Sequence, residues 1–98
     1  MKIYVCTGMN NSKLREKNFD NEFVEKVLCY YGNFDNEFLF PDDLPQGLNP
    51  REEIKMRLSL IDSADRVVFP PNYHYFYRGS IDKDYCEVCG KDWEIFEK

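Results

Sequence analysis

Basic residues are few in this chain: 13 lysines and arginines stand against 18 aspartates and glutamates, giving a formal net charge of −5. Proteins that bind polynucleotides neutralise phosphates with a basic face. Because this composition supplies no such face, we expect no polynucleotide partner. No apolar run approaches the roughly 20 residues of a membrane-spanning helix, and residues 1–9 do not resemble a signal peptide. We therefore expect a cytoplasmic protein without a membrane partner.

Metal-ligating residues are also scarce, with one histidine and four cysteines. A structural zinc ion needs four ligands, and only Cys86 and Cys89 have CxxC spacing, so we predict no metal site and no other cofactor. The same pair lies in the last turn of a predicted helix, where the helix dipole disfavours a thiolate. We expect four reduced thiols, with Cys6, Cys29 and Cys89 packed in the interior and Cys86 at the flank of its helix.

The chain is short, and its 98 residues predict a single domain spanning residues 1–98. Hydrophobic residues make up 43% of the chain, which is enough for one core. A domain of this size leaves much of its surface exposed and gains stability from association. We therefore expect a homo-oligomer.

Predicted strands and helices alternate along the chain. Apolar runs predict strands at residues 2–7, 38–40, 66–69 and 93–96. Two helices are predicted to begin after the caps Asn18 and Asn49, and a third is predicted at residues 80–89. The predicted buried stripe of the second helix comprises Ile54, Leu58, Ile61 and Ala64. Strands separated by helices indicate an α/β fold with a parallel sheet and right-handed crossovers.

Three loops follow the first three predicted strands and meet at one edge of the sheet, where parallel sheets bind ligands. They are residues 7–9, residues 40–42 and residues 70–80. Gly79 and Ser80 in the third loop are typical of a helix start, which would put Asp82 and Asp84 in the first turn, where the helix dipole favours negative charge.

The order of several short motifs resembles a small phage-associated family of the nucleoside 2-deoxyribosyltransferase-like superfamily, over nearly the whole chain. The motifs are TGM, Asn18-Phe19 with Phe23, LFPDDL, PREEI, SADRVVF, and YRGSID with Gly90-Lys91. The resemblance implies a flavodoxin-like (Rossmann-like) three-layer domain with a short parallel sheet of about four strands. It also implies binding of a nucleoside or nucleotide, with cleavage or transfer at its N-glycosidic bond.

The family's nucleophile is a glutamate that this chain lacks at the corresponding place. Counting eight residues back from Gly90 gives Asp82, whereas counting four forward from Gly79 gives Lys83. We interpret Asp82 as the catalytic carboxylate, with Asp84 as the weaker candidate, because a carboxylate can attack or stabilise an oxocarbenium-like sugar. The alternative is that Asp82 only caps its helix.

The chemistry of the residues around these loops suggests which of them bind the substrate. Thr7, Gly8 and Met9 would hold a phosphate or ribose hydroxyl, and Arg78 would pair with a 5′-phosphate. Aromatic stacking or a hydroxyl donor would come from Tyr4, Tyr73 and Tyr77, beside Gly79 and Ser80. Each feature has an alternative: a tight strand exit, a solvated arginine, or tyrosines that pack against another subunit.

Two other functions stay open at this point. A substituted nucleophile in an otherwise intact site is consistent with a non-catalytic phage-type accessory protein that binds or sequesters a nucleotide. The tyrosine-rich loop is consistent with an oligomeric interaction module.

Overall fold

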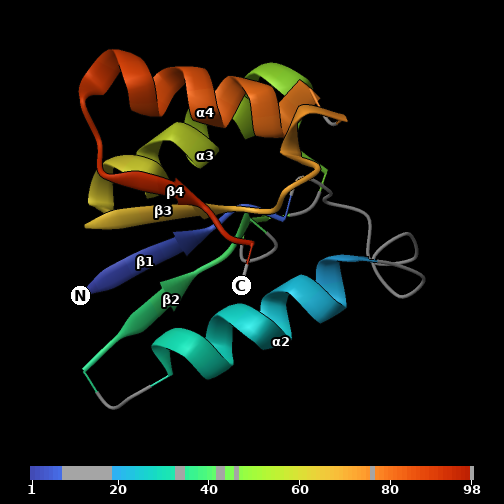
Figure 1. The fold of residues 1–98 in the computed structure, drawn as a ribbon. Coiled ribbons are helices and arrows are strands. Elements are labelled where there is room, and N and C mark those ends of the chain that lie inside the picture. The colour runs from blue at the N-terminus through green and yellow to red at the C-terminus, as the bar shows by residue number, and fades with distance from the viewer. Residues whose placement is uncertain (8–18, 33–34, 42–43, 46, 76, 98) are drawn as a thin grey trace.

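Four parallel strands form one sheet at the centre of the molecule (Figure 1). The computed structural model describes the whole chain except residues 8–18, 33–34, 42–43, 46, 76 and 98. The strands pair in the order β2-β1-β3-β4, and three helices alternate with them, so the fold is the predicted α/β, flavodoxin-like one. The strands are Lys2–Val5 (β1), Glu37–Leu39 (β2), Arg66–Phe69 (β3) and Trp93–Ile95 (β4). The helices are Phe19–Tyr31 (α2), Pro50–Ser63 (α3) and Tyr77–Cys89 (α4), and Tyr73–Tyr75 (η2) is a short 3-10 helix.

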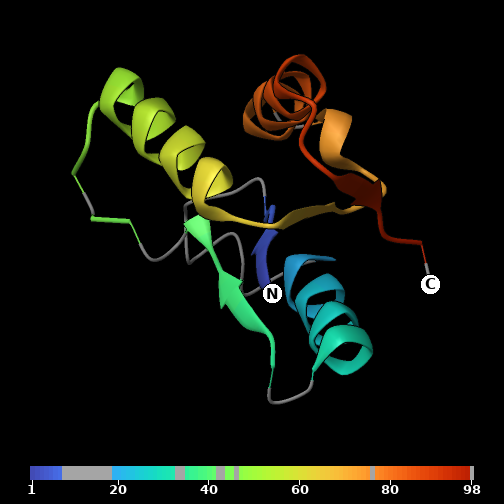
Figure 2. The same cartoon turned by 90° about the vertical axis from the view of Figure 1, so that its left-hand side faces the viewer.

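The sheet separates two layers of helix. Among the described elements, α2 lies against one face, and α3 and α4 lie against the other (Figures 1 and 2). Because side chains alternate along a strand, Ile3 and Val5 pack with α2, whereas Tyr4 and Cys6 point toward α3 and α4. β1 therefore contributes to both cores.

Helix α3 begins as its sequence predicts but buries a different face. Asn49 caps it by accepting a hydrogen bond from the backbone nitrogen of Glu52 at 2.9 Å, and Pro50 is its first residue. The predicted buried stripe is wrong in part, because Ile54 and Leu58 are only half-buried. The buried side chains of the helix are Glu53, Arg57 and Ile61, and Ala64 follows them as its buried C-cap.

Helix α4 ends at Cys89 as predicted but differs from its prediction in its start and in the face that it buries. It begins at Tyr77 rather than Ser80, so Asp82 and Asp84 do not lie in its first turn. The cysteine prediction is reversed, since Cys86 is fully buried and Cys89 is exposed. Cys89 is exposed because the helix buries the face that carries Asp82 and Cys86, one turn apart.

The predictions for the remaining cysteines are confirmed for Cys6 but not for Cys29. All four cysteines are free. Cys6 is buried as predicted, but Cys29 on α2 is exposed. In the described ranges, no helix has the length and apolar character needed to span a membrane.

Candidate functional site

The carboxyl ends of β1 and β3 lie side by side at the centre of the sheet. From β1 the chain runs through α2 to β2 on one side, and from β3 it runs through α4 to β4 on the other. This reversal is the topological switch point at which open α/β sheets bind ligands. The residues that follow β1 and β3 are therefore the candidate ligand site. Gly8 and Met9 lie outside the described residues.

Thr7 leaves an unsatisfied polar group at this switch point. The residue follows β1 and has no exposed surface. Its Oγ1 atom has no hydrogen-bond partner among the described parts of the chain. A buried hydroxyl without a partner costs about 1–3 kcal/mol, and a polar group of a ligand that reached it would remove that cost. Thr7 is thus the predicted site residue with the clearest capacity to bind.

The loop after β3 packs tightly onto the start of α4. The ring of Tyr73 is half-buried and lies 5.7 Å from the ring of Phe69, measured between centroids. Gly79 is buried, and a Cβ atom there would lie 2.5 Å from the carbonyl oxygen of Tyr73. Only glycine permits this approach. Tyr73 and Gly79, two of the predicted site residues, therefore lie against each other, and Ser80, which follows Gly79, is half-buried.

Tyr77 and Arg78 lie on the first turn of α4 by their backbone. Their side chains are outside the part of the chain that the structure describes. Their predicted contacts with a base and a 5′-phosphate stay predictions.

Asp82 is the centre of a buried polar network beneath α3 and α4. Its side chain is 1% exposed and is paired with Arg57, whose Nη2 lies 2.5 Å from Oδ2. The hydroxyl of Tyr4 donates to the same oxygen at 3.0 Å, and the Cys6 thiol lies 3.5 Å from it. The Arg57 Nε lies 3.5 Å from Oδ1. Two of the predicted site residues, Asp82 and Tyr4, are thus joined directly.

Burial and charge shift the pKa values of this network. Burial raises the pKa of Tyr4 well above its ordinary value, and the Asp82 carboxylate raises it further. Burial lowers the pKa of Arg57, but Tyr4, Asp82 and Cys6 together raise it by more, so Arg57 stays protonated. Burial, and then the charge of Asp82, raises the pKa of Cys86 to about 12. Arg57 is therefore charged, whereas the buried phenol of Tyr4 and the buried thiol of Cys86 are neutral.

Counting from Gly90 and from Gly79 gave two different positions for the catalytic carboxylate, Asp82 and Lys83. The structure shows which of the two faces the sheet. Asp82 points into the network, whereas Lys83 lies over the rings of Trp93 and Tyr73, 4.9 and 5.7 Å from their centroids. Lys83 also pairs with Glu87 one turn later. Asp84 is exposed. Of the two predicted catalytic carboxylates, Asp82 alone is placed against the strands.

Arg57 and Glu53 were not predicted as part of this region. Both are buried, one turn apart on α3, on the face that also carries Ile61. The helical spacing of the apolar residues Ile54 and Leu58 predicted a different buried face, because charged residues are rarely buried. A signal was nevertheless present, because positions 53, 57 and 61 have helical spacing.

Among the described residues, no group of three or more His, Cys, Asp or Glu side chains is arranged to hold a metal ion. Searches with the sequence and the structure found no matching protein-family model, curated protein or solved structure. The site must therefore be interpreted from its own geometry.

Proposed function

We propose that the residues at the carboxyl ends of β1 and β3 bind a nucleoside or nucleotide. The observation that carries this proposal is the buried Thr7 hydroxyl without a described partner, at the switch point of the sheet. The motif order that resembles the nucleoside 2-deoxyribosyltransferase-like superfamily supports the same ligand class. We assign the chain to that superfamily's phage-associated branch as part of the proposal.

The ligand's polar groups find their partners in the first loop. The Thr7 hydroxyl would bond to a ribose hydroxyl or phosphate oxygen, with the amides of Gly8 and Met9 beside it. The third loop would supply Tyr73 and Tyr77 for stacking on the base. Arg78 would pair with a 5′-phosphate. These roles agree with an acidic chain, because one arginine and backbone amides suffice for a single small anion.

Binding is the better-supported function, and catalysis is the second candidate. The Asp82 carboxylate is 1% exposed and paired with Arg57, so it would have to leave this pair to attack a sugar. A buried carboxylate that gives up its arginine loses several kcal/mol. The observation in favour of catalysis is that Asp82, and not Lys83, faces the strands beside the Tyr4 hydroxyl. A nucleotide-binding protein of the accessory type needs no such rearrangement.

Thermal-shift measurements with a panel of nucleosides and nucleotides test the binding proposal. A ligand at 100 times its dissociation constant adds about 2.7 kcal/mol to the free energy of unfolding. Thr7→Val removes the hydroxyl while keeping the shape of the side chain, so the free variant should be as stable as the wild type or more stable. It should nevertheless lose most of the ligand-induced shift. Thr7→Ser is the matched control and should keep it.

Two outcomes would reject the binding proposal: no stabilisation by any member of the panel, or equal ligand shifts in Thr7→Val and wild type. Chromatography of the same mixtures for free base tests catalysis separately. Base release by the wild type that Asp82→Asn abolishes would make the protein an N-glycosidic enzyme. Stabilisation without release would leave it as a binder.

A further inference from the structure

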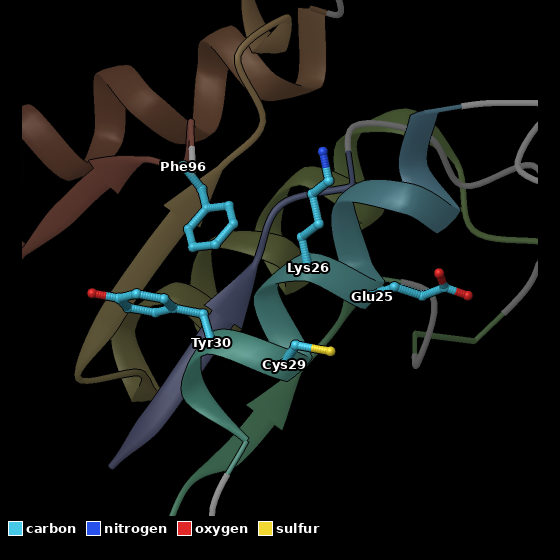
Figure 3. Close-up of a pocket in the computed structure, with 5 residues that line it drawn as sticks. All are labelled: Glu25, Lys26, Cys29, Tyr30 and Phe96. Atoms are coloured by element: carbon cyan, nitrogen blue, oxygen red, sulfur yellow. The ribbon is translucent and has the colours of Figure 1, made fainter.

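A shallow groove runs along the exposed side of α2, on the opposite face of the sheet from Asp82. Its volume is about 450 Å³. Figure 3 shows the side chains that line it: Phe96 after the end of β4, and Glu25, Lys26, Cys29 and Tyr30 on α2. The rings of Tyr30 and Phe96 meet edge to face, 5.5 Å apart between centroids. The groove thus has an aromatic wall and a charged rim.

One aromatic ring of this groove is exposed to solvent. Tyr30 is 55% exposed, although it lies on a helix that covers the core. Among the described elements α2 is the sole helix on this face, whereas the opposite face carries two (Figure 2). Exposed tyrosine beside a packed phenylalanine is the composition found at the centre of protein interfaces.

We propose that the groove is a two-fold dimer interface, occupied by α2 of a second copy of this chain. The charges on its rim favour this occupant. Glu25 and Lys26 are neighbours, and Glu22 lies one turn earlier, 3.3 Å from the Lys26 amine. A partner with a uniformly basic or uniformly acidic surface would attract the side chains of one charge on this rim and repel those of the other. A second copy with its α2 antiparallel sets each lysine against the acids of the other helix.

The two-fold arrangement follows from this charge pattern. In an isologous contact, if residue i meets residue j, then j meets i. Lys26 opposite Glu25 of the second copy therefore forms two equivalent ion pairs. Tyr30 then lies against the helix of the other copy, where its exposed ring surface is removed from water. The proposal is independent of the nucleotide site, because none of the residues that line the groove belongs to that site.

Sedimentation equilibrium across a range of protein concentrations, in reducing buffer, tests the interface. The wild type should show a reversible monomer–dimer equilibrium. Tyr30→Ser should raise the dimer dissociation constant by about tenfold or more, as expected for an aromatic interface centre. Val88→Ser is the matched control, because Val88 is 85% exposed on α4, on the other side of the sheet. It should leave the dissociation constant unchanged. Circular dichroism checks that both variants are folded.

Charge reversal tests the pairing itself. Lys26→Glu sets like charges against each other in its own dimer, and so does Glu25→Lys, so each variant alone should be monomeric. A mixture of the two variants should form a heterodimer, because each acid then meets a lysine.

A wild type that stays monomeric at every concentration would overturn the proposal. So would a dimer that neither Tyr30→Ser nor the charge reversals weaken, because its interface would then lie elsewhere, including at the tyrosine-rich loop. Failure of the mixture to associate would reject the antiparallel pairing.

Discussion

The two faces of the sheet each carry an arginine paired with acidic residues, but in very different surroundings. Arg57 and Asp82 lie between the sheet and the helices α3 and α4, and both are 1% exposed. Arg66 lies on the face of α2, is 27% exposed, and pairs with Asp92 and Glu94. Tyr31 of α2 also donates a hydrogen bond to Glu94. The same type of ion pair is therefore present in a buried setting, the dry pair of Arg57 with Asp82, and in a solvent-accessible one, the wet pair of Arg66 with its two acids.

The difference shows that burial, not the number of ion pairs, decides how strongly such a group constrains the fold. In the dry pair neither partner can be solvated if the other is removed. In the wet pair water and salt replace the lost partner at little cost. Arg57 and Asp82 therefore determine how α3 and α4 sit on β1, whereas Arg66 contributes a modest surface attraction.

The largest expected effect is that of removing the buried arginine. Arg57→Met leaves the Asp82 carboxylate buried and unpaired, and should lower the free energy of unfolding by about 3–5 kcal/mol. Urea denaturation measures the change. The double variant Arg57→Met with Asp82→Leu removes both charges and should recover most of the loss. A double variant less stable than the single one would show that shape, rather than charge, governs this site.

The next effect is the loss of the Tyr4 hydroxyl. Tyr4→Phe removes the 3.0 Å hydrogen bond to Asp82 and should cost about 1.5–3 kcal/mol, the range for hydrogen bonds to charged groups. The same urea measurement applies. Surface substitutions usually change the free energy of unfolding by less than about 0.5 kcal/mol. A change that small in Tyr4→Phe would show that the buried network does not depend on this hydrogen bond.

Alkaline pH should weaken the fold through tyrosines on both faces. The pKa of Tyr31 is raised to about 12, first by burial and then by Glu94, and that of Tyr4 is raised well above 10. Because the unfolded chain loses these protons first, near its ordinary pKa, stability falls as the pH rises from about 10 to about 12. Unfolding at about pH 9 and about pH 11 should show a smaller fall in Tyr31→Phe and Tyr4→Phe. An equal fall in both variants and the wild type would contradict the assignment.

The smallest effect is expected for Arg66, which is half-buried. Arg66→Met should change the free energy of unfolding by at most about 1 kcal/mol, because its pairs are solvated. The difference from the wild type should shrink further as salt is added. A loss as large as that of Arg57→Met would mean that the two faces do not differ in the way their exposure indicates.

The sequence was sufficient to predict the parts of the fold that depend on local chemistry. β3 begins and ends at Arg66 and Phe69, as its apolar run indicated. The Asn49 cap followed by Pro50 is present as predicted. Strand alternation with helices also predicted the parallel sheet, because few topologies fit that order. These features are set by neighbouring residues.

The sequence was insufficient where distant residues decide. The apolar residues Ile81 and Tyr85 of α4 are only half-buried, whereas the helix turns Asp82 and Cys86 inward. That choice is possible only because Arg57, 25 residues earlier, compensates the carboxylate. The sequence of α4 itself contains no pattern that indicates Arg57 as the partner of Asp82. For this reason the sequence predicted Asp82 as a site residue but did not predict that it is buried.

The close contact at Gly79 has a mechanical consequence. The carbonyl of Tyr73 fits against the start of α4 with no room for even a methyl group between them. The end of the aromatic loop and the first turn of α4 are therefore packed backbone against backbone, and any side chain at position 79 would force the two apart.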